Sequence, residues 1–221
     1  MWYNRYKQNP KRRPSMKVLL VNGGPHRTGC TNRALEECAT VLRQEGIEAD
    51  ILWLGNKPIA GCKACGYCAV ANECTYDDMV NYVAEKLDEY DGFIFGTPVH
   101  YAAASGAITS FMDRLFYSAG AKLKGKPGAV ITSARRGGTT ATFDQLNKYL
   151  TINEMPVVSS CYWNNVHGRT AEDVEKDEEG LFIMRKLAAN MAYLLKCIEA
   201  GKAAGIEKAD VGERKFTNFI S

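Results

Sequence analysis

The stretch KVLLVNGGPHRTGCTNRALEECATVLRQEG, residues 17–46, decides the fold of this chain. It opens with a continuous apolar run at 17–24, which is typical of a strand buried on both faces of a parallel sheet. Apolar side chains then recur at helical spacing over residues 31–46, and Gly46 is a suitable end for that helix. A buried strand, a glycine-rich turn and an amphipathic helix together predict the first unit of an α/β fold.

The same alternation continues along the chain. We expect further strands at 49–55, 92–99, 125–135 and 156–164, and further helices at 77–91, 105–118, 139–154 and 177–202. This pattern predicts an α/β, doubly wound, five-stranded parallel sheet with helices on both faces, in the flavodoxin-like strand order 2-1-3-4-5. We therefore expect an N-terminal extension (1–15), one flavodoxin-like domain (16–202) and a C-terminal tail (203–221).

Composition argues against several classes of partner. The 221 residues carry a net charge of only +3, and past residue 16 there is no basic stripe of the kind that binds nucleic acid. No apolar run is long enough to span a membrane. Residues 1–15 lack the apolar core of a secretory signal, so the eight cysteines indicate free thiols in a reducing cytoplasm. We interpret residues 1–15 either as an arm that packs on a partner subunit or as a loose tail.

The turn after the first strand has the composition of a phosphate site. Ligands of such sheets bind at the carboxyl ends of the strands, where helix N-termini offer unpaired N–H groups. The turn fits neither the G-x-G-x-x-G nor the G-x-x-x-x-G-K-[ST] pattern, which favours a phosphomonoester such as that of FMN. The alternative is an ordinary turn. Glycines here allow close approach to an anion, and the polar side chains are His26, Arg27, Thr28, Thr31 and Asn32.

Four cysteines in C-x2-C-x2-C-x5-C spacing follow the second predicted strand, at Cys62, Cys65, Cys68 and Cys74. Thiolates at this density indicate a metal or an iron–sulfur cluster. Three interpretations remain open at this point: a [4Fe–4S] cluster, a zinc ion, or free thiols. Of the remaining cysteines, Cys38 and Cys197 lie on helix faces and are predicted to belong to the core.

Three stretches of the chain resemble the flavodoxin-like NAD(P)H-dependent FMN reductase superfamily, and in particular its iron–sulfur flavoprotein branch. GGPHRTGCTNRAL (23–35) is similar to the family's FMN-phosphate loop, and the cysteine run 62–74 has the compact spacing of the family's [4Fe–4S] ligands. DGFIFGTPVHYAAASGAITSFMDR (91–114) resembles the segment whose P-V-x-Y turn lies against the flavin. The resemblance covers residues 17–200.

The resemblance implies bound FMN, NAD(P)H as co-substrate and an optional [4Fe–4S] cluster on the four cysteines. The residues it assigns to the cofactor are Gly24, Pro25, His26, Thr28, Cys30, Thr31, Asn32, Thr97, Pro98, Val99, His100, Tyr101, Ser133, Ala134, Arg135, Arg136 and Gly138. The chain departs from the family pattern where Gly24 stands for Ser, His26 for Arg, and Cys30 for Asn. The two arginines either lie beside the flavin or receive the phosphate of NADPH, the alternative being a solvated surface.

Two further sets of residues have an expected role. Asp113 and Arg114 are expected to form a structural pair at the end of their helix. Tyr162, Trp163, Asn164 and His167 either cover the nicotinamide or substrate pocket or belong to a loop and the core.

The expected function is an oxidoreductase that passes electrons from NAD(P)H through FMN to a small acceptor such as a quinone, a nitro compound or free flavin. The alternative is an electron carrier that relays electrons between protein partners. The resemblance also implies a homodimer or a homotetramer.

Overall fold

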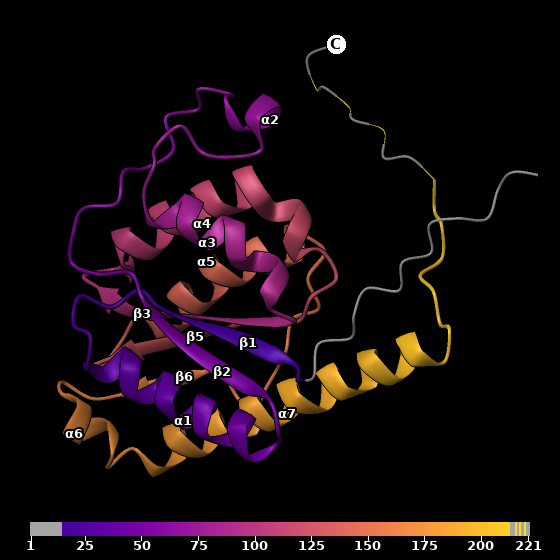
Figure 1. The fold of residues 1–221 in the computed structure, drawn as a ribbon. Helices are drawn as coiled ribbons and strands as arrows, with labels where there is room; N and C mark the ends of the chain where they lie inside the picture. Colours follow the sequence, from indigo (N-terminus) through magenta and orange to yellow (C-terminus); the bar gives the residue numbers. More distant parts are fainter. Residues whose placement is uncertain (1–14, 213–214, 216, 218, 220–221) are drawn as a thin grey trace, which may run out of the picture.

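The computed structural model describes residues 15–212, 215, 217 and 219, so almost all of the predicted N-terminal extension lies outside the described residues. A parallel sheet forms the centre (Figure 1), in the order β2-β1-β3-β5-β6. The strands are β1 Lys17–Asn22, β2 Glu48–Trp53, β3 Gly92–His100, β4 Ala103–Ala104, β5 Gly128–Ala134 and β6 Asn165–His167. The predicted flavodoxin-like order is confirmed, and the sequence did not predict the short β4, which pairs antiparallel with β3.

Helices cover both faces of the sheet, as the sequence predicts. The α-helices are α1 Cys30–Gln44, α2 Cys68–Ala71, α3 Met79–Lys86, α4 Gly106–Ala119, α5 Thr139–Ile152, α6 Ala171–Val174 and α7 Glu178–Ala203, and the 3-10 helices are η1 Leu87–Glu89 and η2 Gly120–Leu123. Among the described residues, no helix is long and apolar enough to cross a membrane.

Two apolar cores lie on opposite faces of the sheet. One core fills the space between the sheet and helices α1 and α7, and the other lies under α3, α4 and α5 (Figure 1). The strands between them carry side chains for both cores, which explains their continuous apolar sequence. Cys38 is fully buried in the first core as predicted, whereas Cys197, also predicted as core, is exposed on α7.

The predicted fifth strand at 156–164 is wrong in its placement. Only Val157 forms a bridge there, to Gly128, and the regular pairing with β5 begins at Asn165 opposite Thr132. Between these two contacts β5 advances by four residues, from 128 to 132, whereas the neighbouring segment advances by eight, from 157 to 165. The neighbouring segment therefore leaves the ladder between the two contacts. Val158 is buried without belonging to a regular strand. Its burial explains why the apolar sequence around it resembled a strand.

Candidate functional site

A pocket of about 620 Å³ opens at the carboxyl-terminal ends of β1, β3 and β5. The position agrees with the rule that open α/β sheets bind ligands outside the carboxyl ends of their strands. It brings together most of the cofactor residues predicted from the sequence: Gly24, Pro25, His26, Thr28, Cys30, Thr31, Pro98, Val99, His100, Ser133, Ala134 and Arg135. Their roles toward FMN remain predictions, but they line one cavity.

The turn after β1 is held by hydrogen bonds from three directions. The Asn22 side chain accepts from the Gly24 N–H at 2.9 Å, so the strand end shapes its own turn. The Trp53 indole at the end of β2 donates to the Gly24 carbonyl at 2.9 Å. Ser105, the N-cap of α4, donates from its hydroxyl to the Gly23 carbonyl at 2.8 Å. Neither Trp53 nor Ser105 was predicted from the sequence, because their partners lie far away in the chain.

Helix α1 presents an uncapped N-terminus to this pocket. Its N-cap residue is Gly29, which makes no side-chain capping bond, and its first turn contains no acidic residue. The first N–H groups of a helix have no partner within the helix, and the helix dipole favours an anion beside them. Because Gly29, Cys30 and Thr31 line the pocket, this helix end is a suitable position for a phosphate group.

The loops after β3 and β5 complete the site. The hydroxyls of Thr31 and Ser133 lie 2.8 Å apart, which joins the start of α1 to the end of β5. Gly138 has φ +93°, and a Cβ at this position would lie 2.8 Å from Val99 Cγ1. Glycine is therefore required where the loop after β5 approaches the end of β3.

Five predicted cofactor residues lie outside the pocket lining. Asn32 is buried and donates to Glu36 at 2.7 Å, and Thr97 is buried and accepts from the Ser105 N–H at 3.1 Å. Tyr101 is fully exposed on the turn between β3 and β4, where its φ is +58°. Arg136 is exposed beyond the pocket, and Gly138 contacts Val99.

Residues 168–172 form one wall of the pocket that was not predicted from the sequence, whereas Gly29, expected to allow close approach to an anion, does line the pocket. Gly168, Arg169 and Glu172 follow β6, so misplacing that strand concealed them. The Cys30 thiol donates to the Gly168 carbonyl at 3.5 Å, and burial, with Asp173 and Glu172 nearby, raises the pKa of this thiol. Cys30 is thus a neutral contact between α1 and this wall.

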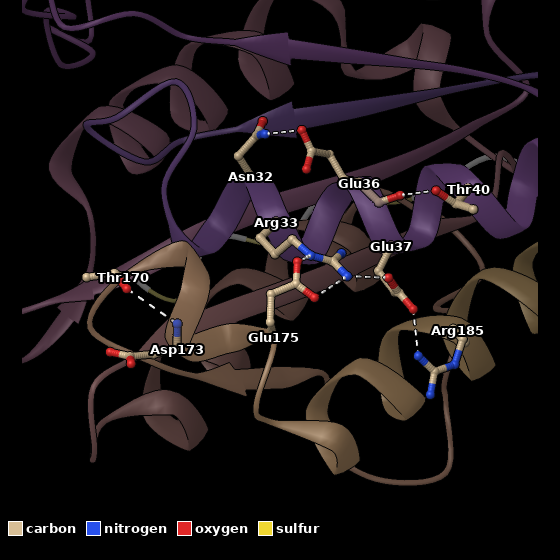
Figure 2. A network of polar contacts seen from close by, with 9 residues as sticks. All are labelled: Asn32, Arg33, Glu36, Glu37, Thr40, Thr170, Asp173, Glu175 and Arg185. Carbon is tan, nitrogen blue, oxygen red and sulfur yellow. Dashed lines mark hydrogen bonds and ion pairs between the residues drawn. The ribbon is translucent and has the colours of Figure 1, made fainter.

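A network of ion pairs holds the same wall against α1 (Figure 2). Arg33 binds Glu175, just after α6, and donates to Glu37 at 2.8 Å, while Arg185 on α7 donates to Glu37 at 2.6 Å. Burial raises the pKa of Glu37, but the hydrogen bonds and charges of the two arginines outweigh it and hold the pKa below its usual range. The network fixes α6 and α7 to the helix that bears the uncapped N-terminus.

The four predicted metal ligands lie on one loop that projects beyond α3 and α4 (Figure 1). Cys62 and Cys65 are exposed, Cys68 begins α2 and is half-buried, and Cys74 is half-buried near the end of the loop. None of the eight cysteines forms a disulfide. Within the described part of the chain, no three His, Cys, Asp or Glu side chains are gathered as a metal site.

Arg114 holds the ends of this loop, which corrects its predicted role as half of a helix-end pair with Asp113. It lies in the middle of α4, 1% exposed, and its guanidinium donates twice to Asp78, at 2.7 and 2.9 Å. It also donates to the Ala60 carbonyl at 3.2 Å and the Tyr76 carbonyl at 3.1 Å. The neighbouring Asp113 accepts instead from the Tyr149 hydroxyl on α5.

The four residues expected either to cover the nicotinamide or substrate pocket or to belong to a loop and the core do not line the pocket. Tyr162 and Trp163 are exposed and form an edge-to-face pair with ring centroids 4.7 Å apart. Asn164 is buried and donates to the Val130 carbonyl at 3.0 Å, and the His167 N–H donates to Asp177 at 2.6 Å. Tyr162 and Trp163 thus lie in a loop, Asn164 lies in the core, and His167 ends strand β6.

Fold and site together define a flavodoxin-like α/β protein with a pocket at the carboxyl ends of its strands. Residues 16–170 match the NADPH-dependent FMN reductase family. The chain belongs to that family, in its iron–sulfur flavoprotein branch, and its class is that of a flavin-dependent oxidoreductase.

Individual relatives agree with this assignment. An iron–sulfur flavoprotein of Methanocaldococcus jannaschii is 29% identical over 192 residues, covering 83% of this chain and 100% of its own length. A second one from the same organism is 31% identical over 196 residues, covering 82% and 98%. Among solved structures, RosB with bound 8-demethyl-8-formylriboflavin-5'-phosphate has a TM-score of 0.65 at 14% identity. The match covers 94% of this chain and 93% of that one, and it supports the fold.

Proposed function

We propose that the protein is an FMN-dependent NAD(P)H oxidoreductase that delivers electrons to a small acceptor such as a quinone, a nitro compound or free flavin. The observation that carries the proposal is the uncapped N-terminus of α1 at the edge of a pocket of about 620 Å³. Bound FMN would supply acceptance of two electrons from a nicotinamide and their transfer to the acceptor. The chain's own residues supply binding, orientation and charge.

The pocket fits FMN at both of its ends. At one end, the free N–H groups of α1 and the hydroxyls of Thr28 and Thr31 would hold the phosphate. At the other end, the backbone of Pro98 to His100 and of Ser133 to Arg135 would border the flavin ring. Arg135 and Arg169 both line the pocket and add positive charge, which favours an anionic reduced flavin or the phosphate of NADPH.

The cysteine loop, residues 60–76, fits a [4Fe–4S] cluster in the kind and number of its donors. Four thiols free of disulfides lie within thirteen residues of one exposed loop, although the described residues do not yet gather them into one ligand set. Soft thiolates select iron–sulfur clusters or zinc. The family branch favours the cluster, and we include it in the proposal as a carrier of single electrons.

The test uses purified full-length protein titrated with FMN and then, without oxygen, with NADPH or NADH. We expect saturable FMN binding and bleaching of the flavin absorbance by the nicotinamide. Thr31→Val removes one hydroxyl at the anion site and should weaken FMN binding about tenfold. Thr40→Val, on the exposed side of the same helix, is the matched control. Protein that binds no FMN would contradict the proposal.

The electron-carrier alternative has one observation in its favour. The cysteine loop is exposed, so a cluster on it would be accessible to a protein partner. Oxidation of NAD(P)H by the pure protein with a soluble quinone would favour the enzyme. Flavin that is reduced only by a protein partner would favour the carrier.

The assembly and the location of the protein also belong to the proposal. We expect a homodimer or a homotetramer, which gel filtration with light scattering would establish, and a monomer would contradict it. Eight cysteines free of disulfides suit a reducing compartment such as the cytoplasm.

A further inference from the structure

Cys74 differs from the other three cysteines of the loop because its backbone is fixed. The Asn81 side chain accepts from the Cys74 N–H at 2.9 Å and donates to the Cys74 carbonyl at 2.8 Å. Asn81 lies on α3, whose N-cap is Asp78, so these bonds hold the cysteine against a helix of the main fold. One bond accepted and one donated by the same amide set both the position and the orientation of Cys74.

The sulfur of Cys74 is fixed as well. The Arg114 Nε donates to Cys74 Sγ at 3.1 Å. Arg114 itself is immobilised, because its other donors are used by Asp78, Ala60 and Tyr76, and its side chain is 1% exposed. A buried guanidinium with a fully used set of donors is a rigid support for the atom at its remaining donor.

The other three thiols lie on the outer part of the loop, where no side chain of the main fold is bonded to them among the hydrogen bonds described. Cys62 and Cys65 are exposed, and left-handed backbone occurs at Ala64, Gly66 and Asn72, between and after them. Cys68 begins the four-residue helix α2. The cysteine loop therefore has one fixed thiol, that of Cys74, and three thiols on its outer segment.

We propose that Cys74 is the pre-positioned thiol of the cysteine loop, that Arg114 and Asn81 are its positioning residues, and that the other three thiols close onto it when a cluster is bound. This inference rests on the cluster included in the proposed function. A ligand that is already in place reduces the number of groups that must be ordered on binding. Partners that orient metal ligands commonly change metal affinity when they are removed.

Arg114 and Asn81 are expected to act in different ways. The Arg114 bond ends on the sulfur, and a hydrogen bond to a ligand sulfur raises the reduction potential of an iron–sulfur cluster. The Asn81 bonds end on the backbone, so they affect the position of the thiol without withdrawing charge from it. Retention of iron therefore depends on both residues, and the reduction potential depends on Arg114 alone.

The experiment compares reconstituted full-length wild type with Arg114→Lys, Asn81→Ala and Asp113→Asn. Asp113 is the matched control, because it lies beside Arg114 on α4 but its carboxylate accepts from Tyr149. The readouts are iron loss to a chelator, the midpoint potential, and alkylation of each cysteine in the iron-free protein by mass spectrometry. We expect about tenfold faster iron loss in R114K and N81A, a lower potential in R114K only, and wild-type behaviour in D113N.

R114K that folds, binds FMN and keeps both the iron retention and the potential of the wild type would overturn the inference. If R114K does not fold, N81A decides, and wild-type iron retention in N81A overturns it. Failure of the cluster itself is distinguishable. Wild type without iron, but with Cys74 alkylated more slowly than Cys62 and Cys65 and this protection lost in N81A, would reject the cluster and support the positioning. Equal alkylation of all loop thiols would overturn the positioning.

Discussion

The turn after β1 and the cysteine loop after β2 both leave the carboxyl-terminal edge of the same sheet, but the fold holds them differently. The turn after β1 is held at its first two residues, Gly23 and Gly24, by bonds from three separate segments of the fold. The cysteine loop is bonded at its ends, by Arg114 and Asn81, and its middle is exposed. If the proposed function holds, the difference separates a site that is ready for its ligand from a site that its ligand must complete.

The largest expected effect comes from adding a side chain at Gly138, in the loop after β5 that completes the pocket beside the turn after β1. Gly138→Val places a β-branched side chain at φ +93° and against Val99, so we expect the free energy of unfolding to fall by roughly 3 kcal/mol. Urea denaturation of the FMN-free protein measures it. Gly137→Val is the control, because a Cβ there meets nothing within 4 Å. Equal losses in the two variants would show that the loop after β5 adapts.

The next effect tests whether a single bond positions the turn after β1. Trp53→Phe removes the indole N–H that donates to Gly24, and we expect FMN binding to weaken about tenfold with little change in stability. Flavin fluorescence titration measures the affinity. Trp163→Phe, on the exposed aromatic pair, should bind FMN as the wild type does. An unchanged affinity in W53F would mean that the other two bonds are sufficient.

Limited proteolysis compares the two regions in one molecule. Lys63 in the cysteine loop and Arg27 in the turn after β1 are both exposed trypsin sites. Because cleavage requires local opening of the backbone, we expect cutting after Lys63 to be at least about fivefold faster in FMN-free, iron-free protein. Mass spectrometry of the early fragments provides the rates. Faster cutting after Arg27 would contradict the proposed difference.

The smallest expected effect concerns the ion pairs that hold the pocket wall. Glu37→Gln should lower the free energy of unfolding by about 1 kcal/mol at neutral pH. The folded-state pKa of Glu37 is lowered, so its contribution is present above the unfolded-state pKa and is lost as the pH falls through the folded-state value. The stability difference between E37Q and wild type should therefore vanish in acid.

The control for the Glu37 prediction is Glu36→Gln. The Glu36 carboxylate accepts from the amide of Asn32, a bond that a glutamine can keep. We expect E36Q to remain within about 0.5 kcal/mol of the wild type across the same pH range. A difference between E37Q and wild type that persists unchanged in acid would rule out the ion pairs as its cause.

The sequence predicts those parts of this fold whose signals are local. The apolar run of β1 and the helical spacing of α1 depend on neighbouring residues, and both elements lie where they are expected. The prediction of the fifth strand failed because the apolar residues at 157 and 158 contact the sheet without continuing its ladder. The β-propensity of a residue does not show which strand it pairs with.

The site divides in the same way. The glycines and threonines after β1 are recognisable because the turn and the helix start are adjacent in sequence. Arg114 could be recognised as part of a helix but not as the support of the cysteine loop, because Ala60 and Asp78 lie 54 and 36 residues away from it. Long-range partners of this kind leave no periodic signal in one sequence.

One guanidinium joins the two ends of the cysteine loop. The Ala60 and Tyr76 carbonyls both accept from Arg114, so the chain leaves the main fold and returns to it at nearly one place. In engineering terms the segment between them is a cassette, and a short turn could replace it without moving α3 or α4. A fold that received this segment would have to provide the buried arginine, its carboxylate partner in the place of Asp78, and the amide that holds Cys74 in the place of Asn81.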